Sequence, residues 1–165
     1  MGLLSIFPAF LAITGLVMAM FVGKSIGYER TTSLANIALY TAVSIAALSI
    51  ASMYSTSNPF GFAAGAVTQL SAIDRKLFGV LMAVAEEQFF RGFLTSFFVS
   101  KTNEMIGCVM SAGVFGIFHL AVYGTAFSAL TYVFLAGLVL SFVAQKTGML
   151  SPVMVAHVIN NWWAI

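Results

Sequence analysis

The sequence has little charge and almost no cysteine. Of its 165 residues only 7 are Lys or Arg and 5 are Asp or Glu, which makes 7% charged, whereas soluble domains carry about 25%. Cys108 is the only cysteine, which excludes an intrachain disulfide and a cysteine-rich metal site. Nucleic-acid binding by counterion release needs a stripe of basic side chains, and the basic residues are too few to form one. We therefore expect no nucleic-acid partner.

Long apolar runs dominate what is present, since 61% of the residues are hydrophobic. A helix needs about 20 apolar residues to cross a bilayer. Such runs fall near residues 3–22, 35–53, 78–99, 105–123, 126–145 and 149–165. The sequence therefore predicts an all-α, polytopic transmembrane helix bundle with about six spans. We expect a single membrane-embedded domain over residues 1–165, multi-pass in the cell membrane, with the lipid bilayer as its surroundings.

Three segments need individual interpretation. Residues 1–21 have no Lys or Arg before their apolar run, which is of full span length, so we interpret them as a first transmembrane helix and not as a signal peptide. Residues 60–73 are too short for a span and favour a re-entrant or interfacial helix. The last run is short, has Pro152 near its start and ends in Trp162-Trp163, which predicts a helix that tilts or stops part-way across.

Ionisable side chains are confined to three of the six runs. A charge inside a membrane is rare and costly, so it indicates a functional site by default. The third run carries two carboxylates and a guanidinium, the fourth an imidazole, and the sixth an imidazole and an amide. These candidate residues are Glu86, Glu87, Arg91, His119, His157 and Asn161.

Helical spacing suggests how these residues divide their roles. Glu87 and Arg91 are four residues apart, in the order that favours an ion pair on one helical face. Glu86 is turned by about 100° from Glu87, so it can point into the bundle as the reactive carboxylate. His157 and Asn161 are also four apart, which places two hydrogen-bond donors on one face.

This set of side chains matches the needs of peptide hydrolysis. A carboxylate beside an imidazole can act as a general base on water, and we assign that role to Glu86 with His119. Attack on an amide carbonyl creates an oxyanion that donors must stabilise, and we assign that role to His157 with Asn161. The sequence therefore indicates an intramembrane endopeptidase.

Other interpretations remain open at the level of sequence. The polar residues can serve as clamps between helices, or as a proton or ion pathway. A zinc site made from Glu86, Glu87, His119 and His157 is a further alternative, because catalytic zinc commonly takes three protein ligands and water. The chain lacks the His-Glu-x-x-His spacing of many zinc hydrolases. We therefore expect no cofactor, with a divalent metal as the alternative.

The motifs Glu-Glu-x-x-x-Arg, Phe-x-x-x-His and His-x-x-x-Asn occur here in this order, with Phe115 preceding His119. Together they resemble the CPBP family, also called ABI, which includes the type II CAAX prenyl endopeptidases. The resemblance covers a motif-bearing core of about residues 78–165.

The resemblance implies a glutamate-dependent intramembrane endopeptidase that needs no metal and cuts a peptide or protein substrate at the membrane. Glu86 and His119 would activate water, while His157 and Asn161 would stabilise the oxyanion. Glu87 and Arg91 would hold the site together. The same resemblance also allows a catalytically inactive member that acts as an immunity factor or as a small subunit of a larger membrane complex.

Overall fold

The computed structural model describes residues 14, 17, 33–53 and 71–164. Within 33–53 and 71–164 every regular element is a helix, which confirms the all-α bundle. The elements are α2 (Leu34–Ser52), α4 (Ala72–Glu86), η1 (Glu87–Thr95), α5 (Ser96–Lys101), α6 (Glu104–Phe118), α7 (Leu120–Tyr123), α8 (Phe127–Thr147) and α9 (Ser151–Ala164). The predicted first span over 3–22 and most of the predicted re-entrant segment over 60–73 lie outside the described residues.

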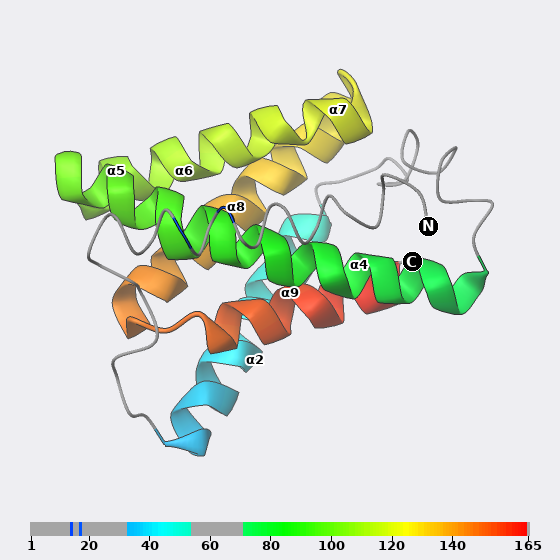
Figure 1. The fold of residues 1–165 in the computed structure, drawn as a ribbon, viewed down its shortest axis with the longest axis horizontal. Helices are drawn as coiled ribbons and strands as arrows, with labels where there is room; N and C mark the ends of the chain where they lie inside the picture. Colours follow the sequence, from blue (N-terminus) through cyan, green and yellow to red (C-terminus); the bar gives the residue numbers. More distant parts are fainter. Residues whose placement is uncertain (1–13, 15–16, 18–32, 54–70, 165) are drawn as a thin grey trace.

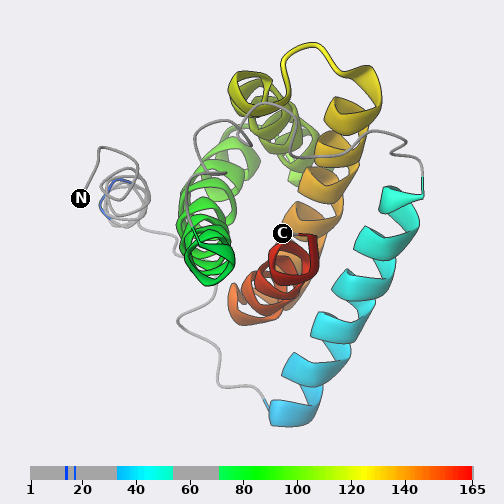
Figure 2. The ribbon, with the colours of Figure 1, turned by 90° about the vertical axis from the view of Figure 1, so that its right-hand side faces the viewer.

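The elements α4, η1 and α5 follow one another without a break and form one long run, called here the central run. Figure 1 shows this run crossing the molecule, with α9 alongside α4 and with α6 above. Helix α9 contacts both α2 and α4, and α6 contacts α8. In Figure 2 α9 lies between α4 and α2. Helix α6 also contacts η1 and α5, so the third predicted span lies against both other polar spans.

Helix ends follow signals that the sequence carries. The Asn103 side chain accepts a hydrogen bond from Ile106 N at 3.0 Å and caps the start of α6. Helix α8 ends at Gly148, which has a φ of 63°, a left-handed conformation that glycine adopts without strain. Ser71 caps α4 by accepting from Asp74 N at 3.2 Å. This cap starts the third predicted span six residues before the expected residue 78.

In the described part of the chain, three helical stretches are long and apolar enough to span a membrane: Leu34–Ser52, Glu104–Tyr123 and Phe127–Thr147. They correspond to the second, fourth and fifth predicted spans. Helix α9 has 14 residues, about 21 Å at 1.5 Å per residue, so it is shorter than a full span. The total of six spans stays a prediction.

Close packing of α5 against α6 depends on Gly107. A Cβ atom at this position would lie 2.6 Å from Val99 N and 2.8 Å from Val99 Cα, which is closer than backbone atoms tolerate. Gly113 lies on the same helix, and a Cβ there would meet no described atom within 4 Å. The α5–α6 contact therefore requires glycine at one of these two positions and not at the other.

Replacing Gly107 with alanine is expected to lower the free energy of unfolding by about 1–3 kcal/mol, the usual cost of overpacking. Gly113→Ala is the matched control, and it should leave stability unchanged or raise it, because alanine favours a helix by roughly 0.5–1 kcal/mol over glycine. Thermal unfolding of both variants in detergent measures the difference. Equal midpoints for the two variants would contradict the close contact.

Candidate active site

The two glutamates lie where the central run changes its winding. Residues Glu87–Thr95 form a π-helix, in which backbone hydrogen bonds join residues five apart, and such segments are frequent at functional sites. Glu86 ends the α-helix before it. The roles inferred from residue spacing rest on α-helical geometry, and no residue pattern in the sequence indicates the π-helix.

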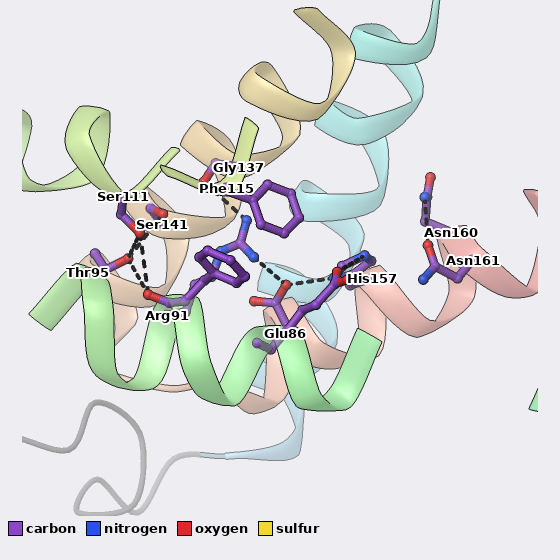
Figure 3. Close-up of polar contacts among 12 residues, drawn as sticks. Glu86, Arg91, Thr95, Ser111, Phe115, Gly137, Ser141, His157, Asn160 and Asn161 are labelled. Atoms are coloured by element: carbon purple, nitrogen blue, oxygen red, sulfur yellow. Dashed lines mark hydrogen bonds and ion pairs between the residues drawn. The ribbon is translucent and has the colours of Figure 1, made fainter. Parts of the chain in front are cut away.

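Three buried hydroxyl groups lie together beside the π-helix, and two of them contact the carbonyl of Phe90. Thr95 Oγ1 donates to Phe90 O at 2.9 Å, and Ser111 Oγ on α6 lies 3.4 Å from the same oxygen. Thr95 Oγ1 is also 2.8 Å from Ser111 Oγ and 3.3 Å from Ser141 Oγ on α8. Figure 3 shows these hydroxyls together at one end of the polar site. They join η1 to two neighbouring helices.

Glu87 joins Arg91 and His157 in one buried ionic group. Arg91 Nη1 lies 2.9 Å from Glu87 Oε1, as the spacing predicted. His157 Nδ1 lies 2.7 Å from the same carboxylate oxygen. Glu87 and Arg91 are both 0% exposed, and His157 is 8% exposed. The group therefore ties α9 to η1 inside the bundle.

The other faces of Arg91 are covered by α6 and α8. Its guanidinium carbon lies 4.4 Å from the centre of the Phe115 ring, a cation–π contact. Arg91 Nη2 donates to the carbonyl of Gly137 at 3.4 Å. Figure 3 shows the guanidinium of Arg91 beside Phe115 and Gly137. Arg91 thus contacts two helices besides its own.

Glu86 lies between the two imidazole rings. Its carboxylate oxygens are 3.9 Å from His119 Nε2 and 3.7 Å from His157 Nε2. Both distances exceed the usual limit of a direct hydrogen bond and suit a bridging molecule. Glu86 is 5% exposed and His119 is 8% exposed. The structure therefore brings these three predicted residues together.

The partners of each ring fix which nitrogen faces Glu86. His119 Nδ1 lies 2.8 Å from the carbonyl of Phe115, and a carbonyl only accepts, so Nδ1 carries the hydrogen. His157 Nδ1 donates in the same way to ionised Glu87. Each ring therefore presents Nε2 to Glu86. Phe115, the first residue of its motif, supplies the acceptor for His119 and the ring that covers Arg91.

Asn161 lies four residues after His157 on α9, beyond the position at which His157 meets the two glutamates. Its Nδ2 donates to the carbonyl of Gly79 on α4 at 3.1 Å, and Figure 3 shows it beyond His157 on the same helix. The structure thus does not place Asn161 in contact with either glutamate. Its neighbour Asn160 accepts a hydrogen bond from Tyr132 on α8 at 2.9 Å, a contact that the sequence analysis missed.

The zinc alternative names four residues, Glu86, Glu87, His119 and His157. Among the residues that the structure describes, no group of three His, Cys, Asp or Glu side chains is arranged to hold a metal ion. His157 Nδ1 and Glu87 Oε1 are bonded to each other at 2.7 Å.

Apolar spans around a buried cluster of carboxylates, imidazoles and a guanidinium define a membrane protein with a polar site inside its helix bundle. Residues 68–163 match the family described as type II CAAX prenyl endopeptidase Rce1-like. This match covers more than half of the chain, so the chain belongs to that family, which is a family of proteases. The resemblance drawn from the motifs is confirmed. Comparisons with curated proteins and with solved structures gave no match.

Proposed function

We propose that the protein is an intramembrane endopeptidase in which Glu86 activates water for attack on a peptide bond. The observation that carries this proposal is the placement of Glu86 between two imidazole Nε2 atoms, 3.9 Å and 3.7 Å away. A single water molecule can bridge gaps of this size. Membership of a protease family supports hydrolysis of peptides.

In the proposed reaction Glu86 and His119 share the role of general base. The His119 Nδ1 hydrogen is held by Phe115 O, so its Nε2 has a lone pair directed to the region beside Glu86. A water molecule between them would lose one proton to this pair as its oxygen attacks the carbonyl carbon. The proton then passes to the amine that leaves.

Charge balance supports a second role for His157. Ionised Glu86 and Glu87 with Arg91 carry a formal charge of −1, and an unbalanced charge in a buried site is costly. A protonated His157 makes the cluster neutral and still donates Nδ1–H to Glu87. Its Nε2–H is then a donor for the developing oxyanion. We propose that the Asn161 amide supplies a second donor.

The substrate class that we propose is a peptide or protein segment presented at the membrane. The family name points to prenylated CAAX termini, so a farnesylated peptide and the same peptide without its lipid are the first probes. Cleavage of only the farnesylated form would indicate that the lipid is recognised.

The decisive experiment compares new peptide termini in membranes that contain wild-type protein with those that contain Glu86→Gln. We expect termini that appear only with the wild type. Identical sets of termini from both membranes would overturn the proposal and favour a catalytically inactive immunity factor or complex subunit.

The glutamate mechanism also predicts that cleavage does not depend on a metal. Treatment of wild-type protein with EDTA and with 1,10-phenanthroline is expected to leave the cleavage rate unchanged, because the proposed base and oxyanion donors are side chains. Rates before and after treatment, and after addition of zinc, measure this. A rate lost on chelation and restored by zinc would contradict the metal-free mechanism.

A further inference from the structure

Three consecutive hydrogen bonds link α8, α9 and α4 beside the active site. Tyr132 Oη donates to Asn160 Oδ1 at 2.9 Å, and Asn160 Nδ2 donates to Asn161 Oδ1 at 3.4 Å. Asn161 Nδ2 then donates to the carbonyl of Gly79 at 3.1 Å. Figure 3 shows the two asparagines side by side on α9.

The carbonyl of Gly79, at the end of this row of hydrogen bonds, fixes the orientation of both amides. Gly79 O only accepts, so the nitrogen of Asn161 must face it. The oxygen of Asn161 therefore faces Asn160, whose nitrogen donates to it, and the oxygen of Asn160 is left to accept from Tyr132. Reversing either amide would bring two acceptor oxygens or two donor nitrogens into contact. The tyrosine hydroxyl thus supports the orientation of Asn161 through Asn160.

Helices α4 and α9 are also connected by a second contact close by. Lys76 Nζ on α4 donates to Trp162 O on α9 at 3.1 Å and lies 4.9 Å from the centre of the Trp162 ring. Helices α8 and α9 also share a buried apolar cluster that includes Leu140, Val153 and Ala156. Because these contacts do not involve the hydroxyl of Tyr132, that hydroxyl is not needed for the helices to pack. Its removal is expected to act on the amides and not on the fold.

We infer that Tyr132 and Asn160 are positioning residues for Asn161. This inference rests on the proposed function, in which Asn161 donates to the oxyanion. The Asn161 amide nitrogen carries two hydrogens. One is used by Gly79 O, and the hydrogen bonds through Asn160 hold the amide in the orientation in which the second can serve the substrate carbonyl. Neither residue touches the substrate in this role.

Tyr132→Phe and Asn160→Leu keep the side-chain shape and remove the hydrogen bonds. Each is expected to lower kcat on a farnesylated CAAX-type peptide by about 3- to 10-fold with KM unchanged, as for loss of one modest hydrogen bond. In an Asn161→Ala background, Tyr132→Phe should cause no further loss, because contacting residues are not additive. Tyr40→Phe on α2 is the matched control and should keep wild-type kcat.

A measurement without substrate completes the test. The side-chain amide resonances of Asn161, identified by their loss in Asn161→Ala, should shift in Tyr132→Phe and stay in place in Tyr40→Phe. Unshifted resonances, or an equal effect of Tyr132→Phe on kcat with and without Asn161, would overturn the inference. Wild-type kcat in Asn161→Ala would also overturn it. The proposed hydrolysis is judged separately by the loss of cleavage in Glu86→Gln.

Discussion

Glu86→Gln is expected to lower the cleavage rate by about 100- to 10,000-fold, the usual contribution of a general base. Glutamine has the same shape as glutamate but does not accept a proton from water at neutral pH. The ring nitrogens of His119 and His157 lie 3.9 Å and 3.7 Å from the carboxylate of Glu86, so no short hydrogen bond to either ring is lost. Folding should therefore be preserved.

Glu104→Gln is the matched control for this change. Glu104 pairs with Lys146 at 2.9 Å where both side chains are partly exposed, 39% and 68% respectively, and it has no role in the proposed reaction. The same carboxylate-to-amide replacement there should leave the rate at the wild-type value. Initial rates on the farnesylated peptide and unfolding midpoints in detergent measure both variants. A Glu86→Gln variant with more than about a tenth of the wild-type rate would contradict general-base catalysis by Glu86.

Arg91→Met is expected to lower the free energy of unfolding by about 3–5 kcal/mol, because it leaves a buried charge without its main partner. Glu87 is fully buried and would keep only the contact with His157. The additional replacement of Glu87 with glutamine should recover much of the loss, since the double variant no longer buries an uncompensated carboxylate. Denaturation in detergent micelles measures all three proteins.

Lys146→Met is the control for loss of an ion pair as such. It breaks the exposed contact with Glu104, and exposed pairs contribute only about 0.2–1 kcal/mol. Its effect on stability should therefore be much smaller than that of Arg91→Met. A double variant as unstable as Arg91→Met alone would show that the cation–π contact with Phe115 and the hydrogen bond to Gly137 matter more than the charge of Glu87.

Much of the site was predictable because charge is rare in an apolar sequence. Glu86, Glu87 and Arg91 stand out in a span-length run, and the pairing of Glu87 with Arg91 follows from their spacing. The grouping of these residues with His119 and His157 was also expected. What the spacing did not predict is that His157 bonds to Glu87 at 2.7 Å, because that contact depends on how α9 packs against η1.

Other features left weak signals in the sequence. Thr95, Ser111 and Ser141 are polar residues within apolar runs, but a lone hydroxyl in a helix usually bonds to its own backbone. Their contacts with one another require three helices to be in place. The family motif includes Asn161 and not Asn160. The contact of Asn160 with Tyr132 depends on α8 and α9 being adjacent.

The amino-acid sequence by itself determined that the chain is a helical membrane protein with a few costly polar groups, because lipid requires backbone hydrogen bonds to be satisfied within helices and makes each buried charge conspicuous. Tertiary structure alone decided the π-helical winding, the tautomers of the two histidines and the partners of Asn161. Those features arise from carbonyl and carboxylate acceptors on neighbouring helices, and residue spacing along one helix contains no information about them.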